Sequence, residues 1–137
     1  MAYSARRVDY FYATATGEPG EAFQLLAHLA DLGVNFVALT LVPVGPDTVQ
    51  LTMFPAEPQR LQNVAKSAGL VINGPHPAVL VQGEDEIGAL AQIHRKLRNA
   101  GVDVFASSAI ADGKGFYGCV LYLRTEHADK AARALQG

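Results

Sequence analysis

Hydrophobic and polar positions in the first half of the chain predict an alternation of strands and helices. Runs of β-branched and aromatic side chains indicate strands, and apolar residues spaced three or four positions apart indicate amphipathic helices. The pattern predicts strands at residues 8–14, 36–44, 48–54 and 70–73, a helix that ends at Gly33, and a helix at residues 58–68. The order is therefore βαββαβ. The nearly continuous apolar run at 36–44 predicts a strand buried on both faces or at a contact between sheets.

The second half of the chain repeats this order but stops one strand short. Its pattern predicts strands at residues 78–82, 102–111 and 116–124, and helices at residues 87–100 and 126–136. Residues 73–77 contain two prolines and predict a short, stiff join between the halves. Without a fourth strand, one edge of the second sheet has no neighbour, and bare edges pair with something. Copy one, another subunit or the N-terminal segment 2–6 is expected to cover it.

The two halves share residues at a constant offset of 68 positions, from Gly20 to Gly88 onward. Further matching pairs are Leu29 and Leu97, Gly33 and Gly101, Val34 and Val102, Ala38 and Ala106, and Gly69 and Gly137. A repeat this long predicts a duplicated small fold rather than a solenoid. We expect repeats 1–74 and 75–137 to share one core or sheet, because units of about 60 residues are marginally stable alone. The predicted class is α+β, a ferredoxin-like βαββαβ unit occurring twice, with an antiparallel sheet and helices on one face.

Composition argues against several classes of function. The net charge is −2 and the basic residues are scattered, which is unlike a nucleic-acid-binding protein. No apolar run approaches the ~20 residues of a membrane span, so we expect no membrane partner. The single cysteine, Cys119, excludes an intrachain disulfide, predicts a small buried residue and favours a cytoplasmic location. We expect no cofactor and no metal, because the histidines lack the short spacing of a metal pair; these are His28, His76, His94 and His127.

Two segments in each copy carry a resemblance to a known family. Residues 17–20 read Gly-Glu-Pro-Gly before an apolar helix, and residues 33–35 read Gly-Val-Asn after it. The second copy has Asp-Glu-Ile-Gly at 85–88 and Gly-Val-Asp at 101–103. This arrangement resembles the ACT domain, and the resemblance covers nearly the whole chain as a tandem pair. It implies a small regulatory module without catalytic activity, which binds an amino acid or another small effector at a domain interface. It also implies a homo-oligomer, a homodimer above all, and a regulated enzyme or protein as partner.

The resemblance places candidate ligand contacts on the turn before each first helix and at the start of each second strand. These residues are Gly17, Glu18, Gly20 and Asn35 in copy one, and Asp85, Glu86, Gly88 and Asp103 in copy two. The first N–H groups of a helix are unpaired and can hold a carboxylate, and glycine lets a ligand approach the backbone. Copy one has Gly17 where copy two has Asp85, so we expect the second site to hold a zwitterion better, with Asp85 and Asp103 facing its ammonium group.

Each candidate also has a purely structural interpretation. Asp85 can cap the helix that follows it, and Asn35 and Asp103 can satisfy backbone groups at the start of a strand. The glycines are explained by turns and caps alone. Two other classes of function stay open. One is an assembly module without a ligand, in which Gly88→Val and Asp85→Ala change nothing. The other is a small enzyme, which requires His28 or His94 at the base of a deep cavity.

Overall fold

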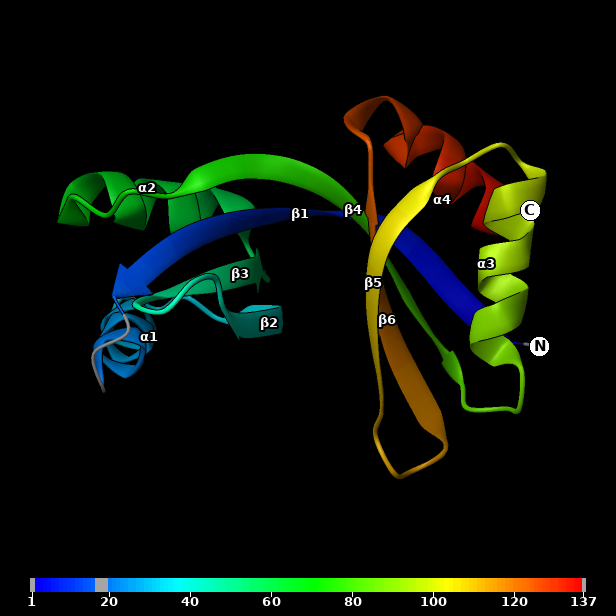
Figure 1. Ribbon diagram of the computed structural model, residues 1–137, viewed down its shortest axis with the longest axis horizontal. Helices are drawn as coiled ribbons and strands as arrows, with labels where there is room; N and C mark the ends of the chain where they lie inside the picture. Colours follow the sequence, from blue (N-terminus) through cyan, green and yellow to red (C-terminus); the bar gives the residue numbers. More distant parts are fainter. Residues whose placement is uncertain (1, 17–19, 137) are drawn as a thin grey trace. The chain divides into compact units, whose positions relative to one another are not determined.

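A computed structural model describes residues 2–16 and 20–136 and confirms the predicted α+β class (Figure 1). Of the candidate site residues, Gly17 and Glu18 lie outside the described residues. The elements in chain order are β1 (Tyr3–Thr16), α1 (Glu21–Asp31), β2 (Phe36–Pro43), β3 (Thr48–Pro55), α2 (Pro58–Ala68), β4 (Asn73–Glu84), α3 (Ala89–Asn99), β5 (Val104–Ala111), β6 (Phe116–Leu123), a 3₁₀ turn (Thr125–His127) and α4 (Ala128–Gln136).

The chain forms two compact units. The first unit is Asp9–His76, and the second unit is Met1–Val8 together with Pro77–Gly137. The strand order is β2-β3-β1-β4-β6-β5, and the long strands β1 and β4 each contribute residues to both units (Figure 1). The repeats 1–74 and 75–137 therefore differ from the compact units in where the N-terminal segment belongs, and their standing as domains stays a prediction.

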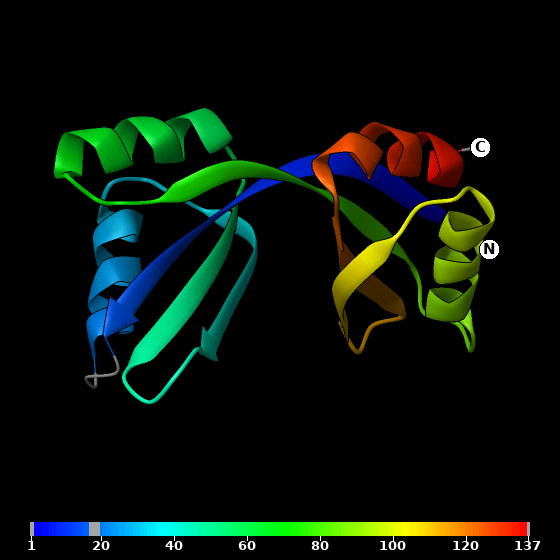
Figure 2. The same cartoon turned by 45° about the horizontal axis from the view of Figure 1, so that its top comes forward.

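The first unit packs both of its helices against alternate residues of β1 and β3. The inward positions of these strands and one residue from each helix form its core: Phe11, Ala13, Ala15, Leu51 and Met53 with Leu29 of α1 and Leu61 of α2. This is the face that the period of two in the strands and of 3.6 in the helices predicts. Figure 2 shows α1 in blue, α2 in green and the β2–β3 hairpin in cyan.

The second unit is built in the same way around α3 and α4. Its core contains alternate residues of β4 and β6 and the apolar stripes of both helices: Val79, Val81, Cys119, Leu121, Leu123, Ile93, Leu97 and Leu135. Details repeat at the same offset of 68 that relates the sequences. The glycines after the first helices, Gly33 and Gly101, have φ of +82° and +76°. Register shifts occur between Phe36 and Ala38 in β2 and between Val104 and Ala106 in β5.

The N-terminal segment covers the edge that the missing strand leaves in the second unit. The backbone N–H of Glu84 donates to the carbonyl of Ala2 (3.1 Å), and the Ser4 hydroxyl donates to the carbonyl of Gln82 (3.5 Å). Numbers rise along one strand as they fall along the other, so the two are antiparallel. Of the occupants left open by the sequence, the N-terminal segment is the one found. The charged residues Arg6 and Arg7 interrupt its apolar pattern, which is why the sequence predicted β1 only from residue 8.

Tyr3 anchors this segment to both helices of the second unit. Its hydroxyl donates to the carbonyl of Leu135 in α4 (2.6 Å) and accepts from Nζ of Lys96 in α3 (2.9 Å). The Lys96 ammonium also lies 4.9 Å from the centre of the Tyr3 ring, within range of a cation–π contact. The strand and the two helices are therefore held together by one side chain.

Two predictions about strands were wrong. In place of the strands predicted at 70–73 and 78–82, with a join between them, there is one strand, β4, which begins at Asn73 and leaves residues 70–72 outside it. Glycine and proline suggested a join, but β4 continues through both prolines. The apolar run at 36–44 is not buried on both faces: β2 lies at the end of the strand order, and its first six residues alternate between half-buried and exposed. Its outward residues Val37 and Leu41 are 43% and 41% exposed.

Candidate ligand pocket at the start of α3

The first turn of α3 carries two unpaired backbone donors. The helix follows Gly88, whose left-handed backbone (φ +84°) suits glycine. The amide of Ala89 donates to the carbonyl of Glu86 and that of Gln92 to the carbonyl of Gly88, each at 3.0 Å. Among the described residues, the amides between them, those of Leu90 and Ala91, have no acceptor. Such groups form the positive end of the helix dipole, which favours an anion.

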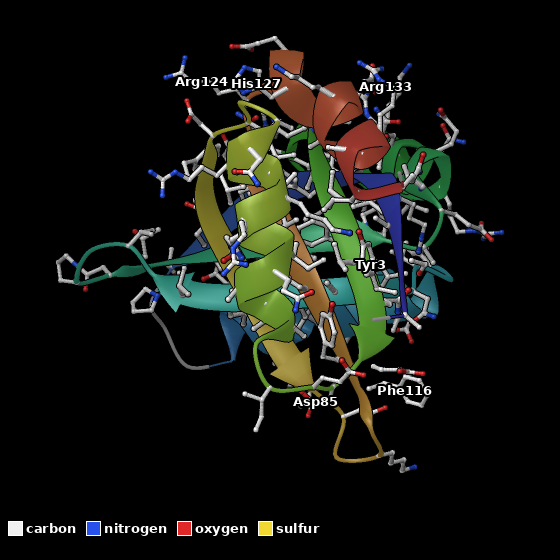
Figure 3. The ribbon with its side chains drawn as sticks, turned by 90° about the vertical axis from the view of Figure 1, so that its right-hand side faces the viewer. Tyr3, Asp85, Phe116, Arg124, His127 and Arg133 are labelled. Atoms are coloured by element: carbon white, nitrogen blue, oxygen red, sulfur yellow. The ribbon has the colours of Figure 1, made fainter. Side chains whose placement is uncertain are left out.

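A pocket of about 230 Å³ lies beside these amides. The turn before α3, the first turn of α3, the last residues of β5 and the side of Tyr117 line it: Asp85, Glu86, Gly88, Ala89, Leu90, Ala91, Ala109, Ile110, Ala111 and Tyr117. The amide of Asp85 donates to the carbonyl of Gly115 (2.9 Å), which ties this turn to the β5–β6 hairpin. Figure 3 shows Asp85 below the start of α3, near Phe116 at the start of β6.

Tyr117 is the one lining residue that offers a buried, unpartnered polar atom. It is 6% exposed, and its hydroxyl has no hydrogen-bond partner among the described residues. Burial raises the pKa of Tyr117 above its usual value, so the hydroxyl keeps its proton at neutral pH and remains a donor. An unpaired buried hydroxyl costs on the order of 1–3 kcal/mol. Tyr117 lines the pocket, so a ligand acceptor that reached this hydroxyl would remove that penalty.

Sequence reasoning missed Tyr117. The alternation of β6 does identify it as inward-facing, together with Cys119, Leu121 and Leu123. An inward position predicts only a core residue, however. Nothing in the local pattern distinguishes a tyrosine whose hydroxyl is satisfied from one whose hydroxyl is not.

Three of the predicted site residues of copy two come together in this pocket: Asp85, Glu86 and Gly88. Both acidic residues are exposed, and among the described residues no side chain makes a capping hydrogen bond to α3. The interpretation of Asp85 as a helix cap is therefore wrong. Two carboxylates and two free backbone amides border the same pocket, an arrangement complementary to a zwitterion.

The predicted pairing of Asp85 with Asp103 does not occur within the second unit. Asp103 is exposed and precedes β5, whereas the pocket lies at the far end of that strand. Eight strand residues at about 3.3 Å each separate the two ends by roughly 25 Å. The sequence placed both residues beside the same helix, but they are at its opposite ends.

In the first unit, Gly20 and Asn35 are separated in the same way. Gly20 has a left-handed backbone (φ +91°) and precedes α1, and Asn35 follows its other end. The carbonyl of Asn35 accepts from the amide of Ala56 (2.8 Å), as expected for a residue at the start of a strand. Glu21 accepts a hydrogen bond from the Thr16 hydroxyl, which lowers the pKa of the Glu21 carboxyl.

Of the two histidines that the enzyme interpretation requires, His94 is hydrogen-bonded and His28 lines an open groove of about 580 Å³. The ring nitrogens of His94 lie 2.8 Å from the carbonyl of Leu90 and 3.3 Å from the Ser107 hydroxyl. The groove at His28 lies between α1 and α2. Within the part of the chain that the structure describes, no three histidine, cysteine or acidic side chains are grouped to hold a metal. In the same residues, no helix is long and apolar enough to cross a membrane.

Cys119 is buried, and burial raises the pKa of its thiol from 9.0 to about 11. We expect the folded protein to resist alkylation by iodoacetamide at pH 8, because the thiolate is the nucleophile, and to react once unfolded in urea.

The raised pKa of the Cys119 thiol contributes stability that is fully present below about pH 9 and is lost as the pH rises through about 11. Urea unfolding across that pH range measures this loss of stability, which should be smaller in Cys119→Ala. Rapid alkylation of the folded protein at pH 8 would contradict the raised pKa of the thiol.

Comparisons with known proteins connect this fold to regulatory domains of aspartate kinases. No family model matches the chain, and no curated protein matches it by sequence. Among solved structures, protein BT0572 from Bacteroides thetaiotaomicron is similar over 96% of this chain and 88% of its own, with 20% identity and a TM-score of 0.80. The ligand-free regulatory subunit of aspartate kinase from Thermus thermophilus is similar over 98% and 94%, with 15% identity and a TM-score of 0.62.

Aspartokinase III from E. coli, solved in complex with lysine and aspartate, is similar over 99% of this chain and 32% of its own, with 14% identity and a TM-score of 0.51. These similarities confirm the ACT-type fold that the paired Gly-Val-Asn and Gly-Val-Asp segments predicted. At such low identity they establish the fold and not the ligand.

Proposed function

We propose that this chain is a regulatory module that binds an amino acid in the pocket at the start of α3 and has no catalytic activity of its own. The observation that carries the proposal is a pocket that presents the free amides of Leu90 and Ala91 beside Asp85 and Glu86. Tyr117 also lines this pocket, and its buried hydroxyl has no partner among the described residues. The ligand carboxylate accepts from these donors, and Asp85 and Glu86 hold its ammonium group.

The similarity to regulatory subunits supports the same class of function. A regulatory subunit of aspartate kinase spans nearly the same length as this chain, and aspartokinase III was solved with lysine and aspartate bound. We propose that ligand binding shifts the packing of the units or of two subunits in a homo-oligomer, and that an enzyme or another protein partner responds. Couplings of this kind are typically about 1–3 kcal/mol.

An amino acid that binds the folded state raises its melting temperature. We expect one or more of the twenty amino acids, at millimolar concentration, to do so in a thermal-shift screen followed by calorimetry. Asp85→Asn should weaken binding of that amino acid about tenfold, equivalent to about 1.4 kcal/mol. Tyr117→Phe should weaken it by a similar factor without destabilising the free protein, because the hydroxyl has no partner to lose.

The matched control is Asp103→Asn, the same change at an exposed acid of the second unit outside the pocket. Its affinity should equal that of the unchanged protein. If no amino acid moves the melting temperature, the proposal fails. The exposed apolar side chains of β2, among them Val37 and Leu41, then favour the assembly module, for which Asp85→Ala and Gly88→Val are silent.

A further inference from the structure

The first unit contains a cavity of about 250 Å³, which is separate from the pocket at α3 in the second unit. It lies between the end of β1, the inner face of α1 and the segment Leu70 to Ile72 that precedes β4. Apolar cavities of about 150 Å³ accept a molecule the size of benzene. The space therefore suits a small organic molecule rather than a single water.

One wall of this cavity is an uncovered strand edge. Residues Ala13 to Ala15 pair with β3 on one side. On the other side β4 begins only at Asn73, and among the described residues no backbone hydrogen bond joins Leu70, Val71 or Ile72 to this part of β1. Successive strand residues direct their N–H and C=O groups to opposite edges. At least one of the three residues therefore presents both groups to the cavity side.

The second unit shows how the same edge looks when it is covered. At the equivalent place, an offset of 68 further on, the backbone of Ala2 bonds Glu84 and Tyr3 lies directly over Gly83. A Cβ on Gly83 would come within 2.6 Å of the Tyr3 Cβ, so no space remains there. In the first unit the equivalent segment is Leu70 to Ile72, and among the described residues it makes no backbone hydrogen bond to this edge. The open edge of the first unit is a difference between the two copies, not a general property of the fold.

The remaining walls are aliphatic, with one charge at the side. Leu25 and Leu29 of α1, Met53 of β3, and Leu70 and Ile72 surround the space, above the small side chains of Ala13 and Ala15. Glu21 also lines it and belongs to none of the ion pairs found in the described residues. The Thr16 hydroxyl bonds the Glu21 carboxylate and keeps it ionised. The walls thus offer an alkyl pocket, an acid and open backbone groups.

We propose that this cavity is a binding site for an aliphatic amino acid, separate from the pocket at α3. The alkyl side chain fills the space among Leu25, Leu29 and Met53, where it leaves water for an apolar surrounding. The ammonium group pairs with Glu21, and the carboxylate accepts from the open N–H of the β1 edge. Polar amino acids bind poorly here, because their side chains would lose hydrogen bonds to water without replacement.

The test uses L-leucine as the probe in a titration followed by amide NMR. We expect leucine to change the chemical shifts of the backbone amides at Ala13 to Ala15 and at Leu70 to Ile72. L-serine should cause smaller changes at these residues. Isoamylamine, which lacks the carboxylate, and 4-methylpentanoate, which lacks the ammonium group, should both bind more weakly than leucine. The observation of no shift at these residues with leucine would overturn the proposal.

Two variants locate the effect. Glu21→Gln should weaken leucine binding about tenfold. Ala15→Leu should abolish leucine binding, because the larger side chain fills the cavity. Because Ala15→Leu can also disturb the core, Glu21→Gln, on the surface, decides if that variant fails to fold. Asp103→Asn, which lies outside both the cavity and the pocket at α3, serves as the control and should leave leucine affinity unchanged. If leucine shifts respond to Asp85→Asn and not to Glu21→Gln, they arise at the pocket beside α3 and the cavity proposal is wrong.

Discussion

A chain that begins at Asp9 should lose the fold of its second unit and keep that of its first. Removal of residues 1–8 takes away the strand beside β4, the contacts of Tyr3 and Ala5 with the core, and the hydrogen bond from Tyr3 to Leu135. A unit of this size has a net stability of only about 5 kcal/mol. Loss of a partly buried aromatic side chain alone costs about 3 kcal/mol, and an uncovered edge adds to it.

Amide hydrogen exchange measures this loss unit by unit. Protection should fall to near zero in α3, α4, β5 and β6, while α1, α2, β2 and β3 stay protected. The matched control is Ser4→Ala within the same segment, since Ser4 is exposed and donates one long hydrogen bond. It should leave both units protected. Full protection of α3 and α4 in the shortened chain would show that the N-terminal strand is dispensable.

A single methyl group at Gly83 should reproduce much of that effect. A Cβ at this position would lie 2.6 Å from the Cβ of Tyr3 and 2.8 Å from the carbonyl oxygen of Ala2, and the second of these is backbone. The N-terminal strand must move for Gly83→Ala to be accommodated. We expect the free energy of unfolding to fall by about 2–3 kcal/mol, at the upper end of the usual cost of overpacking.

The control for this change is Gly118→Ala on the neighbouring strand β6. Gly118 pairs with Gln82, and a Cβ there meets nothing within 4 Å. Chemical denaturation should show little change for Gly118→Ala, or a small gain from the smaller entropy of the unfolded chain. In the chain lacking residues 1–8 the second unit is already unfolded, so Gly83→Ala should have no further effect there. A loss of the same size in Gly118→Ala would show that the strain is not specific to Gly83.

The repeated pattern of the chain was enough to predict the α+β class, the order of the helices and the duplication. These depend on local periods and on glycines at helix ends, such as Gly33 and Gly101, which each segment carries by itself. It also placed Asp85, Glu86 and Gly88 at a helix start. It did not predict the strand formed by Tyr3 to Val8, because its partner β4 is some 80 residues distant and its own charged residues hide the alternation.

Contacts between segments that are distant in the sequence, by contrast, could be identified only in the folded structure. The partner of a strand edge and the absence of an acceptor for the Tyr117 hydroxyl both depend on how elements pack. A local pattern reports which face of an element is apolar, but not what meets that face. The pocket at α3 and the cavity beside β1 are therefore properties of packing, since each is lined from segments far apart along the chain.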